Sequence, residues 1–355
     1  MIVVVIGKLN HVDDSFKMEQ LHTTSKCEKG WPKPLTVLPS KSHTHSIILL
    51  HGRGSNASRF GLEFLESKTS TGKTLQECFP SVKFIFPTAK KRRAAIFKRM
   101  PINQWFDIYS LEDPAERQDL QYDGLRETTE FIGRIVMEEA AGLTEGVRNV
   151  LVGGLSQGCA MALIISLSFI WSGSSGLEES LAASTEAPVV NQSLAGFIGM
   201  SGWLPFAGDI ASVAERDDEE GDDDDPFQTT SVEPTHTADT ATAGNSFYAR
   251  QLRASNYVRD LVDLAPLPQG LQDTAGQEHS TPPHLCSTPY FLGHGTLDEK
   301  VSVRLGQESR AVLSQLGLDV TWAPYDEGHW YKVPDELDDI ASFLRDKIGI
   351  PWSGD

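Results

Sequence analysis

The residue with the clearest chemical potential is Ser156, at the centre of Gly154-Leu155-Ser156-Gln157-Gly158. A short, mainly apolar strand from Asn149 to Gly153 precedes this motif, and the apolar run Met161–Trp171 after it suits a buried helix. This order predicts that Ser156 lies on a tight strand-to-helix turn, where its hydroxyl is placed to act as a nucleophile. The flanking glycines fit such a turn, because it is too sharp for side chains and the helix must pack closely.

A serine hydroxyl is a poor nucleophile until a base removes its proton, so the chain must also supply that base. Two later loops offer a matching acid and base. Asp298 follows the apolar strand Tyr290–Leu292, and His329 follows the strand Val320–Tyr325. We expect His329 to take the Ser156 proton and return it to the leaving group, while Asp298 orients and stabilises the imidazole. The order serine, acid, histidine is that of α/β-hydrolases.

Each of these residues has an alternative interpretation. Asp298 is also suited to a turn or to the N-cap of a following helix, and a lone histidine on a loop is commonly a surface residue. His51 and His294 precede Asp298 and break the expected order, and His51 is better suited to ordering the adjacent glycine turn. Asp326 lies on the same loop as the histidine, which makes it the weaker orienting acid. Cys159 lies in the helix and is expected to be a small core residue.

The tetrahedral oxygen of such a reaction needs two backbone N–H donors. We expect one from Gln157, directly after the nucleophile, and the other from Arg53, in the glycine turn His51-Gly52-Arg53-Gly54 that follows the first strand. The Arg53 side chain has no required part in this role.

Strand-length apolar runs alternate with helical patterns along most of the chain. The expected strands are 46–50, 82–87, 149–153, 194–200, 290–292 and 320–325, and the expected helices are 120–141, 161–171, 248–264, 301–316 and 334–348. Continuous apolar strands separated by helices are typical of a parallel sheet covered on both faces. We therefore predict an α/β-hydrolase fold with a mainly parallel central sheet, interrupted by disordered acidic inserts.

The predicted domain organisation is a poorly ordered extension over residues 1–44, ending in the surface arm Pro34–Pro39, followed by one hydrolase domain over 45–355. Inserts are expected at about 172–193 and 207–287. Residues 208–246 carry too little apolar surface to offset chain entropy, so we expect them to be disordered. Met18 is an alternative start of the chain.

Charge and cysteine content limit the possible functions. The net charge of −18 argues against general nucleic-acid binding, and residues 207–285 contribute −12 of it, with 16 acids against 4 bases. The four widely spaced cysteines suggest neither a zinc site nor a disulfide framework, which favours a reducing compartment. Apolar runs are too short for a signal peptide or a spanning helix, which favours a soluble protein. The basic run Lys90–Arg93 is expected to be a solvated loop, with nuclear import or an acidic partner as alternatives.

Six motifs occur in a fixed order and together resemble the acyl-protein thioesterase, or phospholipase/carboxylesterase, family of serine hydrolases. They are Leu50-His51-Gly52-x-Gly54, Gln104-Trp105-Phe106-Asp107, Gly154-Leu155-Ser156-Gln157-Gly158, Ser201-Gly202-Trp203-Leu204-Pro205, His294-Gly295-x-x-Asp298 and Gly328-His329. The resemblance covers about residues 46–348 apart from the inserts. It implies hydrolysis of acyl thioesters or carboxylic esters, including S-acylated proteins and lysophospholipids, by a cytoplasmic enzyme without metal or cofactor. Transient membrane contact is compatible with it.

The resemblance also implies that Trp105, Trp203 and Leu204 line the acyl site, with core packing as the alternative for the tryptophans. Departures from the family pattern leave the substrate open: Arg53 replaces an apolar residue, and Val301-Ser302 replaces Val-Pro. The alternative functions are a carboxylesterase for small esters with no protein substrate and a non-catalytic binding protein. The acidic insert could recruit a basic partner or regulate access, although a tolerated expansion is the simpler interpretation.

Overall fold

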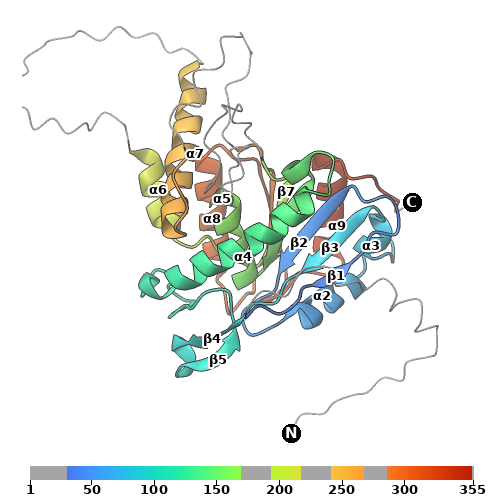
Figure 1. Cartoon of the computed structure of the whole chain (residues 1–355), viewed down its shortest axis with the longest axis horizontal. Helices are drawn as coiled ribbons and strands as arrows, with labels where there is room; N and C mark the ends of the chain where they lie inside the picture. The colour runs from blue at the N-terminus through green and yellow to red at the C-terminus, as the bar shows by residue number, and fades with distance from the viewer. Residues whose placement is uncertain (1–29, 169–192, 217–240, 268–285, 354–355) are drawn as a thin grey trace, which may run out of the picture.

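A computed structural model describes residues 30–168, 193–216, 241–267 and 286–353 (Figure 1). Its centre is a seven-stranded sheet in the order β1-β3-β2-β6-β7-β8-β9, in which β1 is antiparallel to β3 and all other neighbours are parallel. The strands are β1 (Leu35–Val37), β2 (His45–Leu50), β3 (Val82–Phe86), β6 (Val150–Leu155), β7 (Gly196–Met200), β8 (Tyr290–Gly295) and β9 (Val320–Tyr325). The predicted fold class is confirmed.

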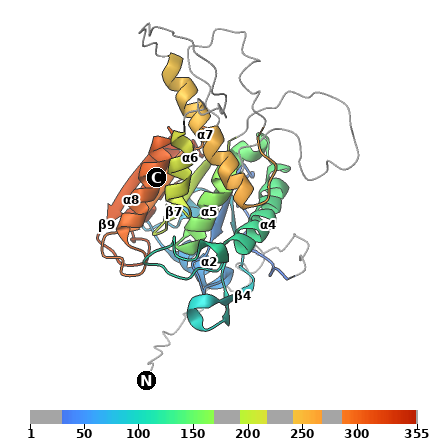
Figure 2. The ribbon, with the colours of Figure 1, turned by 90° about the vertical axis from the view of Figure 1, so that its left-hand side faces the viewer.

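Helices cover both faces of the sheet, as Figures 1 and 2 show. One face carries α2 (Ala57–Glu66), α3 (Leu75–Cys78) and α9 (Asp335–Ser342), and the other carries α4 (Tyr122–Ala140), α5 (Gln157–Ser168), α6 (Ala207–Glu215), α7 (Ala241–Leu261) and α8 (Val303–Gln315). Short helical segments occupy Ala95–Phe97, Gln118–Leu120, Gly146–Asn149 and Phe343–Lys347. Each face therefore has its own hydrophobic core, built from one side of the strands.

The pair β6 and α5 lies deepest in the molecule. Every residue of both elements is buried, because β6 has neighbours on both sides and α5 packs between the sheet and the helices α4 and α7. This explains why α5 is apolar all round rather than amphipathic. The turn between β6 and α5 is therefore held by two elements that have no exposed face along which to shift.

Some elements were not predicted from the sequence. The helix α2 begins at the N-cap Asn56, whose side chain accepts the Arg59 N–H, and it buries Phe60 and Phe64. The arm Pro34–Pro39 was expected to be irregular, whereas its centre forms β1 at the edge of the sheet. The predictions for residues 1–29 lie outside the described residues.

The basic run is part of a two-stranded hairpin, β4 (Lys91–Ala94) and β5 (Met100–Asn103), and not a loop. Lys90 and Arg92 form ion pairs with Glu127 on α4, and both cations lie over the ring of Trp31. Half of the run is therefore bound to the body of the protein, while Lys91 and Arg93 are exposed.

The second insert begins later than predicted. Residues 208–246 were expected to be disordered, but 208–215 lie in α6 and 241–246 lie in α7. Ile210 and Ala214 of α6 are fully buried against neighbouring helices. The predicted helix 248–264 corresponds to α7, which packs beside α6 and against α5 (Figure 2). Predictions for residues 172–192, 217–240 and 268–285 lie outside the described residues.

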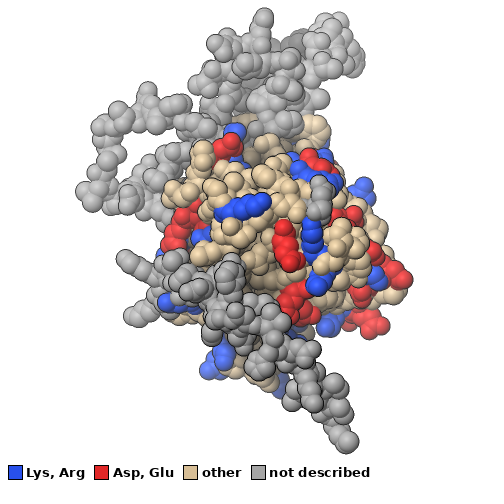
Figure 3. Space-filling model, turned by 90° about the vertical axis from the view of Figure 1, so that its right-hand side faces the viewer, with Lys and Arg blue, Asp and Glu red and all other residues tan. Residues whose placement is uncertain are grey.

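The described surface shown in Figure 3 carries acidic and basic side chains side by side. The acids responsible for much of the net charge lie elsewhere in the sequence, since residues 217–240 contain ten acids and no lysine or arginine. Within the described parts of the chain, no helix combines the length and apolar character needed to cross a membrane.

Candidate active site

Ser156 lies on the predicted turn and has a left-handed backbone conformation, with φ at +57°. This region is unfavourable for a residue with a side chain, and it is maintained here by the buried elements on either side. The Ser156 N–H donates to Met200 O at 2.8 Å. Gly158 is required for close packing, because a Cβ at this position would lie 2.1 Å from Leu50 O. The local sequence thus fixes the serine at the tip of the turn, where only 7% of its surface is exposed.

The structure brings Ser156, His329 and Asp298 together from three separate loops. His329 Nδ1 lies 2.7 Å from Asp298 Oδ2, and His329 Nε2 lies 2.9 Å from Ser156 Oγ. Because a carboxylate only accepts hydrogen bonds, Nδ1 carries the proton and Nε2 is free to accept the Ser156 hydroxyl. This is the tautomer that a general base requires.

Asp298 is fully buried at its side chain and still favours the ionised form. Burial alone would raise its pKa, but hydrogen bonds from His294, from His329 and from the Val301 N–H outweigh that effect and lower the pKa below its usual range. The Lys300 N–H adds a further hydrogen bond at 2.8 Å. A fixed negative charge therefore lies behind the imidazole of His329.

The alternative acids, bases and nucleophiles are placed elsewhere. His51 is buried, and this burial lowers its pKa to about 4; its Nδ1–H donates to Gly52 O and its Nε2 accepts the Ala89 N–H. Cys159 is buried beneath the turn, where desolvation raises its pKa to about 12. His294 donates to Val301 O and supports Asp298 from the side. Asp326 is exposed.

The backbone N–H groups of Arg53 and Gln157, beside Ser156, have no backbone hydrogen-bond acceptor among the described residues. The neighbouring donors Gly54 and Ser55 bind Asn103 O and Gly52 O, respectively. Within the described part of the chain, no backbone acceptor pairs with the N–H of Arg53 or of Gln157, and Gln157 is the first residue of α5. These are the two residues that the sequence indicated as donors to a tetrahedral oxygen.

The side chain of Gln157 has a second function that the sequence did not predict. Its Oε1 accepts the Trp105 N–H at 3.0 Å and its Nε2 donates to Phe106 O at 2.8 Å. The Trp105 carbonyl accepts a further hydrogen bond from Thr128 on α4. This amide therefore joins the 104–107 segment to the catalytic turn. The sequence could have indicated this role, because a glutamine at the start of an apolar helix is expected to be buried and its amide then needs hydrogen-bond partners.

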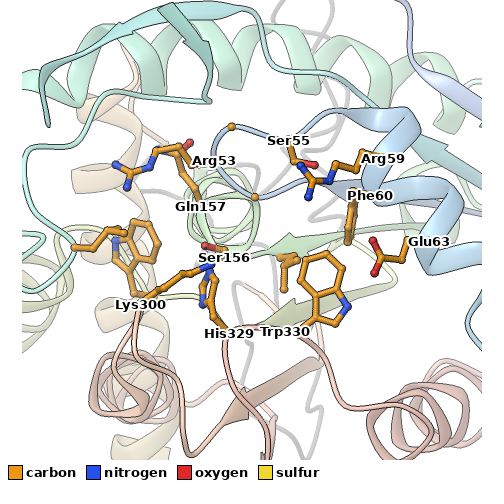
Figure 4. Close-up of a pocket in the computed structure, with 15 residues that line it drawn as sticks. Arg53, Ser55, Arg59, Phe60, Glu63, Ser156, Gln157, Lys300, His329 and Trp330 are labelled. Carbon is orange, nitrogen blue, oxygen red and sulfur yellow. Dashed lines mark hydrogen bonds between the residues drawn. The ribbon is translucent and has the colours of Figure 1, made fainter. Parts of the chain in front are cut away.

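A cavity of about 530 Å³ opens beside Ser156 (Figure 4). In that view Arg53 and Lys300 lie on one side of the serine, while Arg59, Phe60, Glu63 and Trp330 lie on the other. The lining residues are Gly52, Arg53, Gly54, Ser55, Arg59, Phe60, Glu63, Leu111, Leu155, Ser156, Gln157, Trp203, Lys300, His329 and Trp330. The cavity thus combines apolar side chains, such as Phe60, Trp203 and Trp330, with charged side chains.

Of the three residues expected to line the acyl site, the structure places only Trp203 at the cavity. Trp105 is fully buried, and its Nε1–H donates to His51 O at 2.7 Å, so it supports the glycine turn from behind. Leu204 is buried, and its N–H binds the Ser309 hydroxyl on α8. Phe60, Leu111 and Trp330 are cavity residues that sequence reasoning missed, because their positions depend on tertiary packing.

No cluster of three or more His, Cys, Asp or Glu side chains in the described ranges is arranged to hold a metal ion. The chemistry of the site as it stands rests on a buried carboxylate, an imidazole, a hydroxyl and two free N–H groups. This set is sufficient for nucleophilic acyl transfer.

The fold and the side-chain arrangement are those of an α/β-hydrolase with a serine, histidine and aspartate at its centre. Residues 32–177 match the phospholipase/carboxylesterase family, which confirms the resemblance identified from the motifs. Acyl-protein thioesterase 1 of Schizosaccharomyces pombe is 30% identical over 180 residues, which span 51% of this chain and 65% of that protein. Acyl-protein thioesterase 1 of Gibberella zeae is 22% identical over 89% of this chain and 95% of its own.

The crystal structure of acyl-protein thioesterase 2 from Zea mays has a TM-score of 0.54 and 23% sequence identity, covering 89% of this chain and 99% of that one. This similarity shows a shared fold. The chain spans 60–67% of the length of the first three curated relatives that it matches.

Proposed function

We propose that this protein hydrolyses carboxylic esters or acyl thioesters through an acyl-enzyme on Ser156. The observation that supports this most directly is the continuous chain from Asp298 through His329 to Ser156 Oγ, with distances of 2.7 and 2.9 Å. The arrangement offers the nucleophile an acceptor for its proton and offers that acceptor an ionised partner. Such a chain is the standard means of activating a serine hydroxyl.

In the first half-reaction, Ser156 Oγ attacks the carbonyl carbon while His329 Nε2 takes the hydroxyl proton. The Arg53 and Gln157 N–H groups stabilise the negative oxygen of the tetrahedral intermediate, and Asp298 stabilises the imidazolium. Collapse of the intermediate breaks the bond to the leaving group, which receives the proton from His329 and departs as an alcohol or thiol. Water then attacks the acyl-enzyme by the same steps in reverse, which releases the acid and restores Ser156.

The substrate that we favour is an acylated protein, with the acyl chain in thioester linkage, or a lipid ester such as a lysophospholipid. Two relatives named acyl-protein thioesterase 1 support the first choice. Phe60, Leu155, Trp203 and Trp330 provide an apolar surface beside the nucleophile that suits an acyl chain. A cytoplasmic location belongs to this proposal and follows from the family resemblance.

The test is hydrolysis by purified wild-type protein and by Ser156→Ala. We expect Ser156→Ala to lose activity toward p-nitrophenyl esters and an S-palmitoylated peptide by at least about a thousand-fold, since removal of the nucleophile leaves only binding and the free N–H groups. An unchanged circular dichroism spectrum would show that the variant is folded. Activity retained in the folded variant would contradict the proposal.

The chain-length dependence of turnover separates the alternatives. An acyl-protein thioesterase should cleave the palmitoylated peptide and favour long acyl chains, whereas a carboxylesterase for small esters should favour acetate and butyrate. A non-catalytic binding protein should form no covalent adduct with a fluorophosphonate, which reacts only with an activated serine. Mass spectrometry of the labelled protein would locate the adduct at Ser156 or show that there is none.

A further inference from the structure

We propose that Arg53 and Lys300 form a specificity site for an anionic group on the ester, a carboxylate or a phosphate, beside the reacting carbonyl. The proposal rests on the proposed function of the same cavity and adds the charge of its substrate. Of the residues that line the cavity, three are lysine or arginine and one is acidic. This balance is opposite to that of the whole chain, whose net charge is −18.

Arg53 is a half-buried cation with incomplete hydrogen bonding. Its guanidinium lies over the ring of Phe97, with the Cζ atom 5.2 Å from the ring centroid, and its Nη1 is buried without a partner among the described residues. Burial lowers the pKa of Arg53, and the charge of Asp107 counteracts this. Holding an arginine in such a place costs free energy unless a counter-charge is supplied.

The nearby acid does not neutralise Arg53 by contact. Asp107 forms no ion pair with it in the described structure, and its carboxylate accepts hydrogen bonds from the N–H groups of Ala95 and Ile108 and from the Gln104 amide. The charge of Arg53 is therefore only partly balanced within the protein. A substrate anion entering the cavity would supply the missing counter-charge.

Lys300 adds to the same side of the cavity. It lies two residues after Asp298, has no ion-pair partner among the described residues, and appears with Arg53 on one side of Ser156 in Figure 4. Arg59 and Glu63 lie on the opposite side, one turn apart on α2, so their opposite charges offset each other there. The positive potential is therefore concentrated on the side of Arg53 and Lys300.

The two cations should contribute differently. Arg53 is half-buried and can form a charge-assisted hydrogen bond in a partly desolvated site, where screening is weak. Lys300 is exposed, so its attraction for an anion should be weaker and should decrease with salt. In the proposed mechanism the Arg53 backbone N–H donates a hydrogen bond to the oxyanion, while its guanidinium binds the anionic group of the substrate.

The test compares esters that are matched in size and differ in charge. One pair varies the acyl side: p-nitrophenyl pentanoate against the mono-p-nitrophenyl ester of glutaric acid. The other varies the leaving group: phenyl pentanoates with a para carboxamide or a para carboxylate. The variants are Arg53→Met and Lys300→Met, with Arg59→Gln as a control that removes a cation from the opposite side.

We expect wild-type protein to prefer the anionic member of one pair in kcat/KM, and the pair that shows the preference identifies where the anion lies. Arg53→Met should reduce that preference about ten-fold, the size of one charge-assisted hydrogen bond. Lys300→Met should reduce it about three-fold at low salt and much less at high salt. Arg59→Gln should leave it nearly unchanged.

Three results would overturn the proposal: no charge preference in the wild type, an equal loss on neutral and anionic esters in Arg53→Met, or a loss of preference only in Arg59→Gln. In each case, hydrolysis of the neutral esters that depends on Ser156 would leave the proposed function intact. If neither ester of any pair is hydrolysed and the S-palmitoylated peptide is not cleaved either, the proposed function itself fails.

Discussion

Gln157 illustrates how one residue connects the backbone and the side chains of the site. Its N–H lies beside the nucleophile without a backbone partner among the described residues, while its amide holds both the Trp105 N–H and the Phe106 carbonyl. Both of these groups are buried, so the amide satisfies two polar groups that would otherwise be costly. The position of the 104–107 segment therefore depends on the residue that follows the nucleophile.

Replacement of Gln157 by alanine should separate these functions. The N–H remains in Gln157→Ala, but two buried groups lose their partners, so the free energy of unfolding should fall by about 2–4 kcal/mol and kcat by about ten-fold. Gln121→Ala is a suitable control, because Gln121 is buried and its amide binds Pro114 O away from the site. Urea denaturation and ester kinetics would test this: the control should lose stability with little change in kcat. Equal kcat effects in the two variants would argue against a positioning role for Gln157.

At the scale of elements, the loop that carries His329 is attached to the fold by Glu336 near the start of α9. Its Oε2 accepts the Lys332 N–H at 2.9 Å, its own N–H donates to Lys332 O, and its Oε1 is buried without a partner among the described residues. Gly293 on β8 provides the space, since a Cβ there would lie 2.0 Å from Oε1. Burial, with smaller effects from Asp339 and Glu327, raises the pKa of Glu336 to about 8.

This raised pKa predicts how stability changes with pH. Between about pH 4.5, the ordinary pKa, and pH 8, Glu336 is neutral when folded and ionised when unfolded. Unfolding then releases a proton, so the Glu336 contribution to stability, which is full below pH 4.5, is lost at up to about 1.4 kcal/mol per pH unit as the pH rises to 8. Glu336→Gln does not titrate, so its stability relative to wild type should increase over the same window.

Urea denaturation of wild type and Glu336→Gln at several pH values from 5 to 8 would measure this difference. Glu308→Gln, at an exposed glutamate on α8, is the control and should show no such trend relative to wild type. A stability difference between Glu336→Gln and wild type that stays constant across the range would mean that Glu336 is ionised in the folded protein.

The helices and strands that follow from a local hydrophobic pattern could be predicted from the sequence. Elements that depend on contacts with residues distant in sequence could not. The strand β6 and the helix α5 were evident because both are continuous apolar runs around Gly154-Leu155-Ser156-Gln157-Gly158. The hairpin β4–β5 was not, because its charged residues are held by Glu127 and Trp31, which are distant in sequence. For the same reason the motif indicated Trp105 without showing that it lies behind the cavity.

At the scale of the whole molecule, the acidic insert has a sharper boundary than its composition indicated. Ile210 and Ala214 of α6 are buried, so this segment belongs to the folded body even though acidic sequence follows it directly. The low apolar content of 208–246 reflects mainly the acid-rich residues 217–240, and it concealed the apolar side chains of α6. Burial of a few apolar side chains, which depends on a neighbouring helix, decided the structure of α6.

Two deletions should therefore differ. Replacement of residues 217–240 by a short Gly-Ser linker removes ten acids and should leave ester hydrolysis and the melting temperature nearly unchanged. Deletion of 208–246 also removes nearly all of α6, with its buried side chains, and the first six residues of α7. This should lower the free energy of unfolding by several kcal/mol, at about 1–3 kcal/mol for each buried apolar side chain. Thermal denaturation and ester kinetics of both proteins would test this. Loss of activity in the shorter deletion would instead support a regulatory role for the acidic residues.

The burial of three cysteines allows the thiol released from a thioester substrate to be measured directly. Cys78, Cys159 and Cys286, the cysteines in the described part of the chain, are each at most 5% exposed. These three thiols are therefore shielded from disulfide exchange, and none of them lies at the surface where it could accept an acyl group from Ser156. Thioester cleavage can accordingly be followed by trapping the released thiol with a disulfide reagent, and in a Cys27→Ser variant the signal would report the substrate alone.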